Sequence, residues 1–249
     1  MSVLNVETLH PGLSVDCVIF GFHQNELKVL VMKLKGSDVW AVPGGFVEKN
    51  ENVDDAAVHI LKQRVGLEHI FLKQFHLFGD VDRNVNGHAA NLVSKSIIPA
   101  DLLEWFSQRF ITVGYYALVE YSKVKAPQPD YTSEYCGWCS LKELPPLMLD
   151  HTQIVTKAYE ALKAELNHHP IGLDLLPERF TMPELQALYE TILNKKLDRR
   201  NFRRKMLSFD ILIATDERRT GGAHKSPLLY TFDKEKYRRA VKNGLNSAW

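Results

Sequence analysis

The chain has 249 residues, of which 45% are hydrophobic and 24% are charged, and its formal net charge at pH 7 is +1. This is the composition of an ordinary globular protein, long enough for one large or two modest domains. The apolar run 111–119 is too short to cross a bilayer, and the first twenty residues lack the charged segment and apolar run of a signal peptide, so we expect a cytoplasmic protein with no membrane partner.

The three cysteines are too few, and odd in number, for a disulfide framework. Cys136 and Cys139 have the C-x-x-C spacing, but a zinc site needs two more ligands and a redox motif should open a helix. The residues around them alternate as in a strand. We therefore interpret both as core cysteines, and we expect no metal and no cofactor.

The two parts of the sequence differ in charge. Residues 170–249 carry 16 Lys and Arg against 10 Asp and Glu, whereas residues 1–169 carry 15 against 20. Opposite net charges indicate two modules with different partners, and a basic module most simply binds a polyanion such as nucleic acid. The predicted domains are 1–169 and 170–249, with the boundary in the segment Asn-His-His-Pro.

Runs of β-branched and aromatic residues predict that the first domain is built on strands. Asn52 is a suitable N-cap for a helix and Gly66 is its expected C-cap. Residues 85–108 look like an insertion with one short helix, around 100–106. The predicted elements are strands at 15–22, 27–34 and 40–45, a helix at 53–64, strands at 70–78 and 110–121, a strand around Trp138, and a helix at about 151–166.

The second domain has the order helix, helix, basic loop between two strands. Thr181 and Glu184 form a capping-box pattern at the start of the first helix. The apolar stripe of that helix comprises Leu185, Leu188, Tyr189 and Ile192. Asp198 is an N-cap for the second helix, and the strands are predicted at 211–215 and 228–232. This order predicts a winged helix-turn-helix.

One face of the helix at 53–64 bears on whether the first domain is an enzyme. Positions 60, 63 and 64 lie at i, i+3 and i+4, so they could aim three side chains at one cation. Magnesium needs oxygen ligands, whereas Ile60 offers none, Gln63 offers a neutral carbonyl and Arg64 carries a permanent positive charge. An enzyme that displaces phosphoryl groups relies on bound magnesium for charge neutralisation and for nucleophile activation. Because this helix face cannot hold magnesium, these residues predict a protein that is not an enzyme.

The stretch GGFVEKNENVDDAAVHILKQRVGL, residues 44–67, resembles the Nudix box, the loop-helix-loop of diphosphate hydrolases. The positions that match the pattern are Gly45, Glu51, Leu61, Gly66 and Leu67. The positions where the family has an arginine and three glutamates hold His59, Ile60, Gln63 and Arg64. The resemblance implies a Nudix-like α/β/α sandwich, in the α/β (α+β) class, that keeps the scaffold and has lost its catalytic residues.

The helix that follows Asp198 carries a broad cationic face. Its arginines recur at i and i+4, which places them on one side, while Phe202 and Met206 can anchor the other side against the preceding helix. Such a helix suits the DNA major groove, although a solvated basic helix is the alternative. The predicted DNA-binding residues are Arg199, Arg200, Asn201, Arg203, Arg204 and Lys205 on the helix, and Arg218, Arg219, His224 and Lys225 in the loop.

Together the two halves resemble the Nudix-related transcription regulators, in which a Nudix-like sensor domain precedes a DNA-binding winged helix. The strings that carry the resemblance include WAVPGGFV, LFGDVDR, GYYALVEY, and LLPERFTMPELQALYE followed by LDRRNFRRKM. The resemblance implies a homodimer on a double-stranded DNA operator and a small-molecule effector, either a pentose or an ADP-ribose-like nucleotide. We expect a pentose and a role in sugar catabolism, because a phosphate-rich ligand favours cations near the box and only Arg64 is evident there.

The effector pocket is predicted from groups that can stack on a ring or bind hydroxyls. Trp40 and Phe46 are the candidates for stacking, and Asp16, Asp82 and Arg83 are the candidates for hydroxyl contacts. The insertion at 85–108, where many family members pass almost directly to the next strand, would lie beside this pocket.

Two other functions remain open from the sequence. An active diphosphatase would need carboxylates from elsewhere, such as Glu48 or Glu51 with Asp80. A protein-interaction adaptor with a basic tail would bind DNA without sequence preference. Turnover of ADP-ribose with magnesium tests the first alternative, and selection from random duplexes tests the second.

Overall fold

The computed structural model describes residues 4–67, 70–83, 87–219 and 226–244, and the chain divides into two compact units. Unit 1 comprises Met1–Phe20, Lys28–Val119 and Lys123–Ala158. Unit 2 comprises Gly21–Leu27, Glu120–Ser122 and Tyr159–Trp249. The chain thus passes from one unit to the other within the helix α4 (His151–Glu165), and the boundary between residues 169 and 170 stays a prediction.

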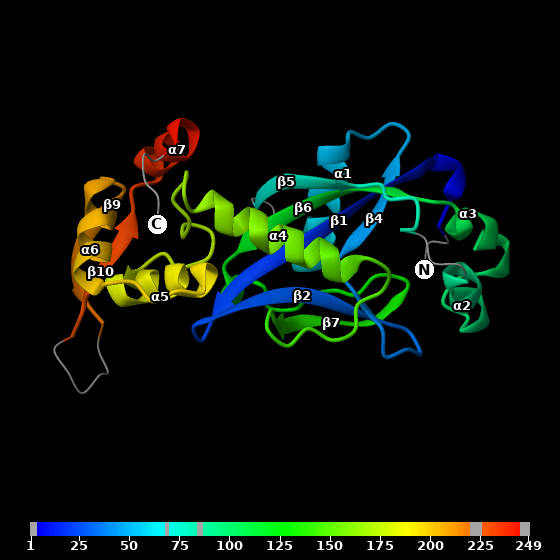
Figure 1. The fold of residues 1–249 in the computed structure, drawn as a ribbon, viewed down its shortest axis with the longest axis horizontal. Coiled ribbons are helices and arrows are strands. Elements are labelled where there is room, and N and C mark those ends of the chain that lie inside the picture. The colour runs from blue at the N-terminus through cyan, green and yellow to red at the C-terminus, as the bar shows by residue number, and fades with distance from the viewer. Residues whose placement is uncertain (1–3, 68–69, 84–86, 220–225, 245–249) are drawn as a thin grey trace. The chain divides into compact units, whose positions relative to one another are not determined.

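A seven-stranded sheet is the framework of the first half of the chain (Figure 1). Its strands are β1 (Leu9–His23), β2 (Glu26–Leu34), β3 (Trp40–Ala41), β4 (Gly44–Glu48), β5 (Phe71–Phe78), β6 (Ile111–Val119) and β7 (Ser133–Ser140). The order is β3-β2-β1-β6-β5, with β4 paired to β1 and β7 paired to β2. The predicted strand at 40–45 is divided into β3 and β4 around Pro43, which has no backbone N–H for a ladder.

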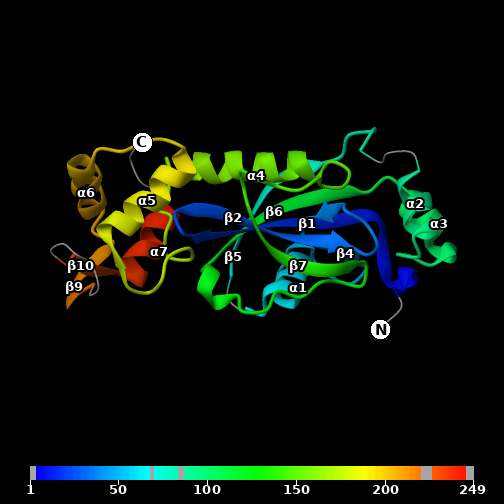
Figure 2. The ribbon, with the colours of Figure 1, turned by 90° about the horizontal axis from the view of Figure 1, so that it is seen from below.

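The helix α1 (Val53–Val65) is the one that the box predicts. It ends at Gly66, whose left-handed φ of 69° lets its N–H donate to the Lys62 carbonyl. Asn52 is the N-cap residue, as predicted, but its side chain donates to the Asp55 carboxylate at 2.8 Å instead of capping a backbone N–H. Figure 2 shows α1 on one side of the strands and α4 on the other.

The described part of the segment between β5 and β6 holds three short helices, where the sequence predicted one. They are α2 (His88–Ser94), η2 (Ala100–Leu102) and α3 (Leu103–Ser107). The helix α2 was missed because it has only seven residues and starts after Gly87, which offers no side-chain cap. Leu92, Ile97 and Ile98 pack with Leu34 of β2 in a small core of their own. The insertion is therefore a folded addition fixed to the sheet.

Unit 2 contains a winged helix. Its elements are β8 (Phe180–Thr181), α5 (Met182–Leu193), α6 (Arg199–Ser208), β9 (Leu212–Arg218), β10 (Leu228–Phe232) and α7 (Lys234–Asn243), and the sheet order is β8-β10-β9. The predicted capping box is present, since Thr181 N donates to Glu184 Oε2 at 2.7 Å and Glu184 N donates to Thr181 Oγ1 at 3.3 Å. The short β8 and the final helix α7 were not predicted.

Buried aromatic rings hold the winged helix together. Tyr189 of α5 lies edge to face with Phe202 of α6, with ring centroids 5.4 Å apart. The Phe232 ring of β10 packs against Phe180, with centroids 4.7 Å apart, and against Tyr237 of α7, with centroids 5.1 Å apart.

Across the described residues, no helix has both the length and the apolar character needed to cross a bilayer.

Candidate ligand cavity and nucleic-acid interface

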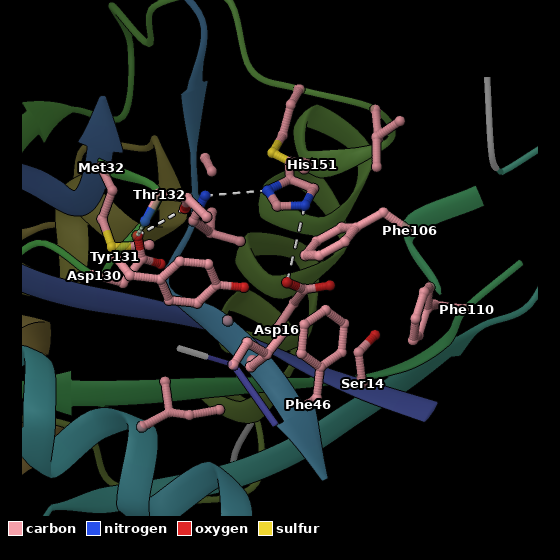
Figure 3. Close-up of a pocket in the computed structure, with 18 of the residues that line it drawn as sticks. Ser14, Asp16, Met32, Phe46, Phe106, Phe110, Asp130, Tyr131, Thr132 and His151 are labelled. Atoms are coloured by element: carbon pink, nitrogen blue, oxygen red, sulfur yellow. Dashed lines mark hydrogen bonds and ion pairs between the residues drawn. The ribbon is translucent and has the colours of Figure 1, made fainter. Parts of the chain in front are cut away.

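Unit 1 contains a cavity of about 370 Å³ (Figure 3). This volume lies in the usual range for small-molecule sites, about 300–1,000 Å³. The walls come from β1, β4, α1, the insertion, the loop before β7 and the start of α4. The ionisable and polar groups among the lining residues include Asp16, Glu48, Glu51, His59, Gln63, Arg64, Arg83, His88, Asp130, Tyr131 and His151.

The two glycines of the box make room for side chains of this cavity. The register of β1 and β4 pairs Asp16 with Gly44, and a Cβ on Gly44 would collide with the Asp16 carboxylate. A Cβ on Gly45 would lie 2.9 Å from Ile60 Cδ1. A Cβ on Gly44 would also lie 3.0 Å from the Val15 carbonyl oxygen, so Gly44 is required by a close backbone approach, whereas a side chain at position 45 would displace the end of Ile60.

Arg83 is held between two buried carboxylates. Its Nε donates to Asp150 Oδ2 at 2.5 Å, one Nη donates to Asp16 Oδ2 at 3.3 Å, and the other donates to the Phe110 carbonyl at 2.7 Å. The side chains of Arg83, Asp16 and Asp150 are 7%, 10% and 14% exposed. Charge-assisted hydrogen bonds between desolvated groups are strong, so they fix the Arg83 side chain in the cavity wall.

His151 presents a neutral ring to the cavity. The backbone N–H of Val42 donates to its Nδ1 at 3.1 Å, which places the ring proton on Nε2, 3.8 Å from Asp16 Oδ1 (Figure 3). Burial lowers the pKa of His151, although Asp16 and Asp150 oppose that shift. Burial also lowers the pKa of His88 on the same cavity, with a smaller contribution from His151. Both rings thus supply neutral donors and acceptors at pH 7.

All four altered positions of the box line the cavity, on the face of α1 that the sequence predicted. Ile60 is 8% exposed and packs on Gly45. Gln63 Nε2 lies 2.9 Å from His59 Nε2, and His59 Nδ1 lies 3.7 Å from Glu51 Oε1, so these three side chains form a chain of contacts. Within the ranges that the structure describes, no three His, Cys, Asp or Glu side chains gather closely enough to hold a metal ion.

Arg64 differs from Arg83 although both line the same cavity. One Nη of Arg64 donates to the Pro129 carbonyl at 3.3 Å. Its Nε is buried and has no hydrogen-bond partner. A buried donor without a partner costs about 1–3 kcal/mol.

The cavity gathers three of the five predicted pocket residues: Asp16, Phe46 and Arg83. Trp40 and Asp82 are not among its lining residues; the Trp40 ring packs edge-on against Tyr135 with centroids 5.9 Å apart, and Asp82 is exposed in a turn. The residues that the sequence analysis missed include His88, Phe106, Phe110, Tyr131 and His151. They come from segments far apart in the chain, and no spacing could have grouped them.

The basic face of α6 is exposed as predicted. Asp198 Oδ1 accepts from Asn201 N at 2.9 Å and caps the helix. Phe202 and Met206 are 2% and 0% exposed, so they hold the helix from beneath. The exposed residues of the face are Arg199, Arg200, Asn201, Arg203 and Arg204. Lys205 is half-buried, and burial lowers its pKa.

The arginines at the base of the wing have partners within unit 2. Arg218 donates to the Ser226 carbonyl at 2.9 Å. Arg219 forms an ion pair with Glu184 at 2.8 Å. His224 and Lys225, which were also predicted to contact DNA, lie outside the described residues.

Family comparisons agree with this architecture. The NUDIX domain model matches residues 10–161. The chain belongs to the NUDIX domain family. The NrtR DNA-binding winged helix domain matches residues 172–232, C-terminal to the NUDIX match. The predicted fold, a Nudix-like α/β domain followed by a winged helix, is therefore confirmed.

Individual relatives extend the match over nearly the whole chain. The "ADPR responsive transcriptional repressor NtrR" of Acinetobacter baylyi is 27% identical over 234 residues, which cover 91% of this chain and 84% of that protein. The crystal structure of Shewanella oneidensis NrtR complexed with a 27mer DNA is 25% identical, with a TM-score of 0.73, and the match covers 94% of this chain and 98% of that one. The NUDIX domain and winged helix together make this chain a DNA-binding transcriptional regulator with a Nudix-like effector domain.

A third relative matches a shorter part of this chain. The ADP-ribose pyrophosphatase of Methanocaldococcus jannaschii is 33% identical over 88 residues, 34% of this chain and 50% of that protein. The expected resemblance to sugar-responsive regulators finds no support among these relatives, because the regulator that matches over most of its length is named as ADPR responsive.

Proposed function

We propose that the NUDIX domain of this regulator binds an ADP-ribose-like nucleotide without hydrolysing it, and that the bound nucleotide changes operator binding by the winged helix. The observation that carries the proposal is Arg64, a half-buried cation on the cavity wall whose Nε has no hydrogen-bond partner. It stands at a box position where a hydrolase carries a metal-binding carboxylate. An anionic effector takes the place that a metal would have.

The chemistry of the cavity favours a nucleotide over the pentose expected from the sequence. A pentose has no negative charge, so it would leave Arg64 Nε without a charged partner. A nucleoside diphosphate offers anionic oxygens to Arg64, hydroxyls to Asp16 and His151, and an aromatic base to the phenylalanines of the wall. The name of the Acinetobacter relative supports the same choice.

Hydrolysis is disfavoured by the same residues. A divalent cation needs several oxygen ligands, and the α1 face offers Ile60, the amide of Gln63 and the cation of Arg64. These side chains do not fit a magnesium site. Glu48 and Glu51 do line the cavity, and the partial match to a pyrophosphatase keeps hydrolysis as the second candidate.

The winged helix is proposed to read DNA through α6. Its exposed arginines and Asn201 would enter the major groove, and the cations of the wing would follow the backbone. We propose that the protein acts as a homodimer on a pseudo-palindromic operator, as two-fold DNA sites require two copies of one reading helix.

The test compares ligands and variants of the full-length protein. Saturating ADP-ribose should raise the melting temperature and shift the affinity for a duplex chosen from a random pool, whereas arabinose and xylose should do neither. Arg64→Gln should weaken ADP-ribose binding about ten- to a hundredfold, because a charge-assisted bond contributes about 1.5–3 kcal/mol. Lys62→Gln, an exposed change on the same helix, is the matched control.

Two results would contradict the proposal. A pentose that stabilises the protein while ADP-ribose does not would return the effector to the sugar class. Release of AMP and ribose 5-phosphate from ADP-ribose and magnesium at ordinary enzyme rates would show that the domain is a hydrolase.

A further inference from the structure

The two ends of the cavity differ in chemistry. Figure 3 shows Asp130 and Tyr131 on one side of Asp16 and Phe106 and Phe110 on the other, with His151 near the middle. Arg64 belongs to the first end, since it donates to the Pro129 carbonyl beside Asp130. One end is therefore polar and carries a cation, and the other is aromatic.

The aromatic end is a cluster of four rings. Phe46 is at its centre, with centroids 5.6 Å from Phe106, 5.0 Å from Phe110 and 5.8 Å from Trp105. Trp105 and Phe110 are 5.6 Å apart. None of the four is fully buried, and Phe46, Phe106 and Phe110 line the cavity. The cluster thus keeps aromatic surface open to a ligand, whereas packing alone would close it.

The insertion builds much of this end. Phe106 lies on α3 and His88 and Leu92 lie on α2, and all three line the cavity. The small core around Leu92, Ile97 and Ile98 fixes α2 to β2, so the aromatic wall is positioned by packing and not by a free loop. Half-buried His88 adds a ring whose pKa is lowered by burial, and which is therefore neutral at pH 7.

We propose that the insertion makes this aromatic end a base-binding subsite, in which Phe106 with Phe46 and Phe110 stacks on the nucleobase of the effector. The diphosphate then extends past Asp16 and His151 to Arg64 at the opposite end. This inference rests on the proposed function and adds the direction of the ligand and a specificity-determining residue. Phe106 selects effectors that carry an aromatic base, which a bare sugar phosphate lacks.

Binding of three probes to the full chain tests the subsite. The probes are ADP-ribose, AMP, which keeps the base, and ribose 5-phosphate, which lacks it. Phe106→Leu keeps an apolar side chain and removes the ring. This variant should weaken the binding of ADP-ribose and of AMP by the same factor, about tenfold, and should change the affinity for ribose 5-phosphate by less than about twofold. Arg64→Gln should weaken the binding of ADP-ribose and of ribose 5-phosphate by similar factors. Leu103→Ala, an exposed change on α3, is the control.

The outcomes separate this inference from the proposed function. If wild-type protein binds ADP-ribose but Phe106→Leu binds all three probes as the wild type does, the subsite is overturned and the proposed function stands. An equal loss for all three probes would also overturn it, since a base contact cannot affect a ligand without a base. If wild-type protein does not bind ADP-ribose, the proposed function falls and the subsite falls with it.

Discussion

The helices α1 and α6 both carry arginines, yet they place them in opposite surroundings. On α1, Arg64 lies in a cavity wall with a buried, unpaired Nε. On α6, the arginines at 199, 200, 203 and 204 are exposed, and the buried residues are Phe202 and Met206 beneath them. One helix turns its cation toward the interior of its unit, and the other turns its cations to the solvent.

The difference teaches what each helix can bind. A single half-buried guanidinium is only weakly screened by salt and makes directional bonds with one small anion. A row of exposed guanidinium groups can pair with the phosphates of an extended polyanion, and this binding releases the counterions that surround the polyanion. The contrast therefore predicts that nucleotide binding depends little on salt concentration and that DNA binding depends on it strongly.

The largest expected effect comes from replacing Arg83, because this arginine has a structural role, whereas Arg64 and the arginines of α6 are proposed to bind ligands. Arg83→Met should lower the free energy of unfolding by about 3–5 kcal/mol, because it leaves the buried carboxylates of Asp16 and Asp150 without their cation. Chemical denaturation of wild type and variant measures the loss. Arg109→Met, at an exposed position, is the control. A loss of less than about 1 kcal/mol, which is the value of a surface ion pair, would mean that Arg83 is free to bind ligand.

The next effect concerns α6. Arg199→Ala with Arg203→Ala should weaken operator binding by about 1–3 kcal/mol for each base contact removed, with no loss of thermal stability, because both side chains are exposed. Fluorescence anisotropy at several salt concentrations measures affinity and salt slope together. Lys157→Ala, an exposed change on α4, should alter neither. Undiminished binding by the double variant would exclude α6 as the reading helix.

The smallest effect is a pH dependence of stability. Because burial lowers the pKa of His151 and of His88 in the folded state, the unfolded chain binds more protons just below the ordinary histidine pKa of about 6.5. The stability is complete above about pH 6.5 and falls as the pH drops toward the lowered pKa values. Melting temperatures measured from about pH 8 to about pH 5 should show this decline.

His151→Asn tests the assignment of that decline. Asparagine can still accept from the Val42 N–H but does not titrate, so the variant should show a shallower decline than the wild type. His10→Asn, at an exposed position on β1, should follow the wild-type curve. An identical decline in His151→Asn and wild type would show that other groups cause it.

Local rules accounted for much of the fold. The strands, the helix α1 with its Gly66 end, and the capping box of α5 follow from residues adjacent in sequence, and the structure confirms them. The helix α7 was not predicted, although Asp233 caps it by accepting from two backbone N–H groups. In the insertion, α2 was missed and η2 and α3 were merged into one predicted helix, because each is too short to show a periodic pattern.

The sequence alone determined which side chains share a helix face. Ile60, Gln63 and Arg64 share a helix face by spacing, and the arginines of α6 share another, because helical periodicity is a local property. Only the tertiary structure decided that Arg83 is bound by two carboxylates, that Trp40 and Asp82 lie away from the cavity, and that Phe106 lies in its wall. Those facts depend on pairing and packing between distant segments, which spacing along the chain does not encode.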